Sequence, residues 1–196
     1  MIQNERDIRK ELALQAARQM MVAARTAPKG KGIDIIEIAL ATDDDIRRMS
    51  DEMLKISAET GMKFFLRDAD NILQSDVVMI LGTRRKPQGL NCFHCGYKTC
   101  ESKPAEAPCA LNTVDLGIAV GSACAKASDL RVDTRVMFSA GLAAQHLEML
   151  GKDCGCVMAI PVSATSKNPF FDRKPKQPET QERIASTDGA LPIFLQ

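Results

Sequence analysis

The sequence predicts an α/β protein in which helices flank a central sheet and an irregular, cysteine-rich loop is inserted. Segments with apolar residues at helical spacing alternate with short runs of β-branched and other apolar residues. One stretch, residues 91–109, has neither periodicity and holds four of the seven cysteines. With 196 residues, 45% of them apolar, the chain is long enough for one sizeable core. We expect a single domain over residues 1–173 and a polar tail or arm over 174–196.

The first predicted elements are a helix and a strand. Residues 4–24 carry apolar side chains at a spacing of four, which is typical of a helix with one buried face. Residues 26–32 are rich in Pro and Gly, which end a helix because neither continues it at low cost. Residues 33–40 are rich in isoleucine, which predicts a strand.

Two helices and a second strand are expected next. Thr42 precedes three aspartates, which predicts a capping hydroxyl followed by acids at the positive end of a helix dipole. This helix should end near Thr60, because Gly61 follows it. Residues 62–73 form a further short helix, and residues 76–81 a strand that is apolar on both faces, as in a covered parallel sheet.

The C-terminal half predicts two helices and a third strand. Residues 110–128 are rich in Ala, Leu and Val, and Gly117 and Gly121 suggest a buried helix packed closely against a neighbour. Residues 134–150 form an amphipathic helix, and residues 154–162 form a strand.

Charge and composition exclude several classes of function. The 26 basic and 25 acidic residues lack the basic excess that phosphate neutralisation requires, so we expect no nucleic acid partner. No apolar run is long enough to span a membrane, and the polar N-terminus does not resemble a secretory signal, so a cytoplasmic protein is expected. In that reducing compartment seven cysteines indicate metal ligands, redox thiols or buried small residues rather than disulfides.

The closely spaced cysteines predict a metal centre within a loop at about residues 88–112. Cys92, Cys95, Cys100 and Cys109 can wrap an iron–sulfur cluster of the 4Fe–4S type, because an irregular loop can point four thiolates at one compact body. A structural zinc site is the alternative, since zinc also takes four thiolates, with His94 as a substitute ligand. Zinc ribbons usually carry two Cys-x2-Cys knuckles, whereas this loop has one.

Resemblance to known families supports the cluster. Residues 92–101 resemble the small 4Fe–4S domain of corrinoid iron–sulfur proteins, although the gap to Cys109 is shorter here. Residues 112–122, 131–137 and 163–173 resemble the uncharacterised prokaryotic ferredoxin-domain family, which has the same short gap. The resemblance implies a 4Fe–4S cluster and leaves the function open. Our first hypothesis is single-electron transfer through this cluster to a redox partner protein, with the physiological reaction unknown.

A second resemblance implies a flavin. Residues 25–28 (Arg-Thr-Ala-Pro) resemble the start of FMN-dependent nitroreductases, and residues 167–169 (Lys-Asn-Pro) and Arg173 are candidate flavin-side groups. Residues 29–32 (Lys-Gly-Lys-Gly) are a candidate phosphate cradle or a solvated turn. FMN fed by the cluster is therefore the alternative function, and a zinc-stabilised binding module is a third.

Four further features carry candidate chemistry. Cys154 and Cys156 should share one face of a strand, as a redox pair, extra ligands or two buried residues. Cys124 is expected to be core. The basic run 84–86 is a candidate docking surface or a solvated loop, and His146 a candidate proton relay or a surface residue. The polar tail and the small residues of the 110–128 helix are compatible with a homodimer.

Overall fold

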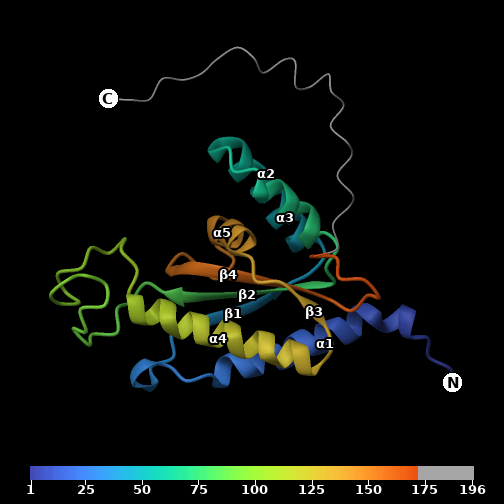
Figure 1. The fold of residues 1–196 in the computed structure, drawn as a ribbon, viewed down its shortest axis with the longest axis horizontal. Coiled ribbons are helices and arrows are strands. Elements are labelled where there is room, and N and C mark those ends of the chain that lie inside the picture. Colours follow the sequence, from blue (N-terminus) through green and yellow to red (C-terminus); the bar gives the residue numbers. More distant parts are fainter. Residues whose placement is uncertain (172–196) are drawn as a thin grey trace, which may run out of the picture.

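Four antiparallel strands form the central sheet of the computed structural model, which describes residues 1–171 (Figure 1). Their order across the sheet is β1-β2-β4-β3. The strands are β1 (Ile36–Ala41), β2 (Val77–Arg84), β3 (Asp133–Thr134) and β4 (Cys154–Ser163). The predicted central sheet is confirmed, and the parallel arrangement suggested for residues 76–81 is wrong. Strand β2 is apolar on both faces because helices cover both, and such cover is independent of strand direction.

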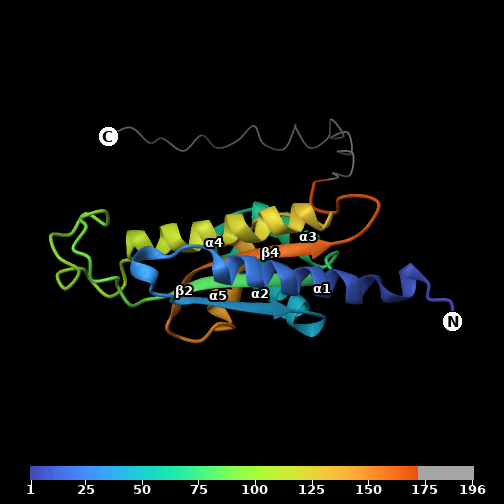
Figure 2. The ribbon, with the colours of Figure 1, turned by 90° about the horizontal axis from the view of Figure 1, so that it is seen from below.

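Helices lie on both faces of this sheet and form two separate apolar cores with it (Figure 1). Helices α2, α3 and α5 cover one face. Helices α1 and α4 run side by side across the other, as Figure 2 shows. The helices are α1 (Glu5–Thr26), α2 (Asp44–Thr60), α3 (Phe64–Ile72), α4 (Ala110–Asp129) and α5 (Phe138–His146), with a short 3-10 turn at Gly30–Gly32.

Two helix ends differ from the prediction. Helix α2 ends as expected, because Gly61 takes a left-handed φ of 72° and its N–H bonds the carbonyl of Ser57. At its start, however, the capping position is Asp43 rather than Thr42, and no side chain caps the helix. Helix α5 is shorter than the predicted 134–150, because Thr134 already belongs to strand β3.

The two glycines of α4 do not mediate close helix packing. Alanines on the opposite face of α4, among them Ala119 and Ala123, are fully buried in the core shared with α1. Gly117 and Gly121 are exposed, and a Cβ atom built on either would meet nothing within 4 Å. Small residues do pack α4 closely against α1, but they are alanines on the face opposite Gly117 and Gly121.

A bulge in β4 separates the two cysteines that were expected to share a face. Leu81 pairs with Met158 but Thr83 pairs with Gly155, so β4 contains one extra residue at this point. Cys156 lies in the bulge with a left-handed φ of 51°. As a result Cys154 packs in the core under α5, whereas Cys156 packs against the core on the α1 and α4 side. The shared face predicted from period-two alternation is therefore wrong.

The described residues set the limits of two further predictions. The predicted tail over 174–196 and the candidate flavin residue Arg173 lie outside residues 1–171. Within those 171 residues, no helix combines the length and the apolar character needed to cross a membrane.

Candidate functional site

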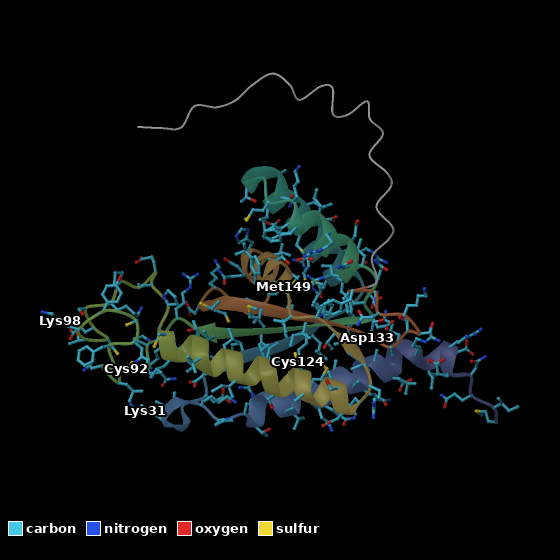
Figure 3. The ribbon with its side chains drawn as sticks, in the orientation of Figure 1. Lys31, Cys92, Lys98, Cys124, Asp133 and Met149 are labelled. Carbon is cyan, nitrogen blue, oxygen red and sulfur yellow. The ribbon has the colours of Figure 1, made fainter. Side chains whose placement is uncertain are left out.

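The cysteine-rich loop connects the end of β2 to the start of α4 and projects from one end of the molecule (Figure 1). It has no helix or strand between Arg84 and Ala110, as the sequence predicted. Figure 3 shows Cys92 and Lys98 in this loop, with Lys31 of the 3-10 turn below it. The loop therefore lies where α1 and β2 end and α4 begins.

Buried polar side chains of α4 fix the base of the loop. Asp115 is 4% exposed, and both its carboxylate oxygens accept the Gly30 N–H at 3.0 Å. The Gln88 amide also donates to Asp115, at 3.2 Å. Asn112 donates to the carbonyl oxygen of Lys86 at 2.8 Å. One turn of α4 thus holds the 3-10 turn and the chain entering the loop in place.

These anchoring residues were missed as site residues in the sequence. Their signal was present, because Asn112 and Asp115 are polar residues in a helix otherwise rich in Ala, Leu and Val. Buried polar groups need partners, so such residues point to a defined contact. Within residues 1–171 the Asn112 Oδ1 and Gln88 Oε1 atoms are buried and have no hydrogen-bond donor.

Local hydrogen bonds shape the loop around its cysteines. Asn91 and Cys100 bond reciprocally: the Asn91 N–H donates to Cys100 Sγ at 3.4 Å, and the Cys100 N–H donates to Asn91 Oδ1 at 2.7 Å. A tight turn follows Cys92, with φ of 62° at Phe93 and 82° at Gly96. N–H···S bonds of this kind stabilise a thiolate that binds metal.

The four thiols lie in this loop and at its return to the body. Cys92, Cys95 and Cys100 are half-buried, and Cys109 is buried at the N-cap position of α4. Among residues 1–171, no three Cys, His, Asp or Glu side chains converge closely enough to hold a metal ion. The donor set itself fits an iron–sulfur cluster, since four free thiols occur in one irregular segment with an N–H···S bond already formed.

His94 contacts the backbone of this turn. Its Nδ1 lies 2.9 Å from the carbonyl oxygen of Cys92. This contact turns the imidazole ring toward the main chain, so the metal-binding groups that the loop has in common are its cysteine thiols.

The two arginines of the basic run 84–86 lie in different environments. Arg84 pairs with Glu37 of the neighbouring strand β1, at 2.5 Å. Arg85 makes no side-chain hydrogen bond or ion pair within residues 1–171, and its Nε would lie 3.3 Å from a Cβ atom at Gly155. The Arg85 guanidinium therefore lies across the bulge of β4.

The structure does not bring the candidate flavin residues together. Lys29 donates to the carbonyl oxygens that end α1, at 3.1 Å for Ala24, and the Gly30 N–H is taken by Asp115. Asn168 instead bonds Asp133 at 3.0 Å. Figure 3 shows Lys31 and Asp133 at opposite ends of the molecule. In the 29–32 turn, Lys29 and Gly30 are thus bonded within the chain, whereas Lys31 and Gly32 are exposed to solvent.

Two hollows lie beside the cysteine loop. The first, the more polar of the two, has a volume of about 320 Å³ and is lined by charged, polar and apolar groups together with Cys109 and Cys156. The second has a volume of about 450 Å³, lies between α4 and α5, and is lined almost entirely by apolar side chains. Gln145 and Cys156 line both hollows.

The remaining candidates have structural surroundings. His146 lies 3.3 Å from Glu52 across α5 and α2, on the surface. Burial raises the pKa of the Cys124 thiol, which packs against the core as expected. Burial also raises the pKa of Cys156, partly offset by the positive charge of Arg85.

Comparison with known proteins supports the sequence resemblance. A family described as uncharacterized protein containing a ferredoxin domain matches residues 105–173, a stretch that includes Cys109. A protein of Archaeoglobus fulgidus named only "Uncharacterized protein" is 39% identical over 187 residues, covering 90% of this chain and 100% of the relative. The chain belongs to this ferredoxin-domain family.

The fold of this member of the ferredoxin-domain family is similar to that of solved nitroreductases. A nitroreductase with bound FMN from Desulfitobacterium hafniense is 16% identical, with a TM-score of 0.55, over 92% of this chain and 89% of that one. A nitroreductase with bound FMN from Bacteroides fragilis is 10% identical, with a TM-score of 0.56, over 85% and 84%. At these identities the likeness concerns the fold alone.

Proposed function

We propose that this chain is a 4Fe–4S protein of cytoplasmic electron transfer, with Cys92, Cys95, Cys100 and Cys109 as the cluster ligands. The observation that carries the proposal is the irregular loop, which holds three free thiols within nine residues and returns to a fourth at the start of α4. Such a cluster supplies one-electron transfer when bound. The membership of this chain in the ferredoxin-domain family supports this function.

The chain's own residues favour negative charge at this position. Cys109 precedes the first turn of a 20-residue helix, whose N–H groups and positive dipole end would stabilise the negative charge of a bound cluster. The Asn91 N–H already bonds the sulfur of Cys100. Asp115 and Asn112 hold the base of the loop against α4, so the segment that carries the ligands is fixed where it leaves the body of the chain.

The loop is accessible to a partner protein. Phe93 is 65% exposed and Tyr97 37% exposed, and both lie between the first three cysteines. Lys98 is exposed in the same turn region (Figure 3). Exposed aromatic groups beside positive charge suit a redox partner whose docking surface is acidic.

An FMN-dependent oxidoreductase is the second candidate, and the fold is the observation that favours it. Both nitroreductases named above contain bound FMN. Lys31 is the one ammonium of the 29–32 turn whose contact is long, at 3.4 Å to the carbonyl oxygen of Gln88. In this second function the cluster would sit beside a flavin on the same chain.

Metal, sulfide and flavin analysis of anaerobically purified protein tests these functions together. We expect about four irons and four sulfides per chain and a brown colour. Cys92→Ala and Cys109→Ala should each lose the iron, the sulfide and the colour. Cys124→Ala is the matched control, because that thiol lies on α4 outside the loop, and it should keep the iron. About one zinc per chain and no colour would refute electron transfer and favour the zinc-stabilised module. Flavin at one per chain would favour the oxidoreductase.

A further inference from the structure

The two hollows beside the loop differ in chemistry and meet at shared walls. The polar hollow lies at the end of β2 and the apolar one between α4 and α5. Because Gln145 and Cys156 line both, the two hollows adjoin, and together we call them the cleft, with a polar end and an apolar end. Their volumes, about 320 and 450 Å³, are in the range of small-molecule sites.

The polar end carries charges of both signs. Arg84 and Arg85 both line it, against one carboxylate, that of Glu106. Arg84 is already paired with Glu37, so Arg85 supplies the charge that has no partner within residues 1–171. Cys109 also lines this end, so it opens on the first turn of α4, whose N–H groups attract anions.

The apolar end can accept a hydrocarbon or aromatic body. Leu116, Val120, Phe138 and Leu142 line it, and Phe138 is 53% exposed there. Gly117 contributes a wall with no side chain, and a Cβ atom at that position would meet nothing within 4 Å. The groove is therefore open along α4.

The bulge of β4 creates the junction between the two ends. Its extra residue turns Cys156 toward the α4 side of the sheet and leaves Gly155 under the Arg85 side chain. Bulges commonly redirect a side chain at a functional site. Regular alternation from Cys154 would instead have placed Cys156 on the α5 side of the sheet.

We propose that this cleft binds a small amphipathic anion, with its acidic group at Arg85 and its apolar body along Gly117 and Phe138. The charge at one end and the apolar groove at the other select this class over a neutral or a wholly polar ligand. Cys109 would then lie beside the bound acid. The apolar end is formed by the body of the chain, whereas residues 105–109 of the cysteine loop line part of the polar end.

Isothermal titration calorimetry with octanoate as the probe, and 1-octanol as its uncharged counterpart, tests this site on the full chain. We expect octanoate to bind at least about fivefold more tightly than 1-octanol. Arg85→Gln should weaken octanoate binding about fivefold and leave 1-octanol binding unchanged. Lys86→Gln is the matched control, because Lys86 is the adjacent exposed base and lines neither hollow.

A second pair of variants tests the apolar end. Gly117→Leu should weaken the binding of both probes about tenfold by filling the groove. Gly121→Leu should weaken neither, since it is an equally open glycine one turn along α4 that lines neither hollow. Equal effects of Arg85→Gln and Lys86→Gln on octanoate binding would overturn the site. Equal effects of Gly117→Leu and Gly121→Leu would also overturn it. A dimer that Gly117→Leu dissociates, with no octanoate bound, would overturn it in favour of a second copy in the groove.

Discussion

Removing the carboxylate of Asp115 should destabilise the chain and loosen the base of the cysteine loop. In Asp115→Ala, the Gly30 N–H and the buried Gln88 amide lose their acceptor, at 3.0 and 3.2 Å. A hydrogen bond to a charged acceptor contributes about 1.5–3 kcal/mol. Gly30 is only half-buried and recovers a bond to water, so the larger loss is at Gln88. We expect the free energy of unfolding to fall by about 3 kcal/mol.

Urea denaturation followed by far-ultraviolet circular dichroism, under anaerobic reducing conditions, measures this loss. Asp129→Ala is the matched control, because Asp129 is the exposed last residue of the same helix. It should change stability by no more than about 0.5 kcal/mol, and upward, since it removes a negative charge from the negative end of the helix dipole. If the two variants were equally stable, the contacts of Asp115 would contribute nothing to holding the loop base.

Three further predictions concern packing, titration and the loop. Gly141→Ala should lower the free energy of unfolding by about 3 kcal/mol or more, because the added Cβ would lie 2.1 Å from a backbone oxygen of β4. Gly121→Ala should raise it by about 0.5–1 kcal/mol, because nothing lies within 4 Å of a Cβ at that position. Thermal melts of both variants measure the difference. Burial raises the pKa of Cys154 from 9.0 to about 11, so the folded chain holds a proton that the unfolded chain has lost. Stability in urea should therefore fall as the pH rises from 9.0 to about 11, and Cys154→Ala should flatten that slope. Asn91→Ala removes the acceptor of the Cys100 N–H and should release iron in air about tenfold faster than wild type, as followed by loss of visible absorption; an unchanged rate would refute the role of this contact.

Local signals in the sequence predicted most of the elements. The spacing of apolar residues over 4–24 corresponds to α1 (Glu5–Thr26), and Gly61 ends α2 with the left-handed φ that favours glycine. The predicted strand 154–162 corresponds to β4 (Cys154–Ser163). The absence of periodicity over residues 91–109 likewise predicted the irregular loop. These features depend on residues close together in the chain, which is why sequence patterns reveal them.

Features that depend on distant partners were not predictable in the same way. Strand β2 is covered by helices on both faces, and that cover gives the same composition in parallel and antiparallel sheets. Gly117 is small and lies in an apolar helix, yet which face it occupies depends on where α1 packs. The anchoring by Asp115 depends on Gly30 and Gln88, which are distant in sequence.

The bulge of β4 separates the thiols of Cys154 and Cys156 across the thickness of the sheet. A disulfide requires Cβ atoms about 3.5–4.5 Å apart that point toward each other, which side chains on opposite faces do not provide. Cys154 and Cys156 are close in sequence, but the strand between their side chains prevents a disulfide from forming in the folded chain. A disulfide between them in purified protein would record a chain that was oxidised before β4 paired with β2.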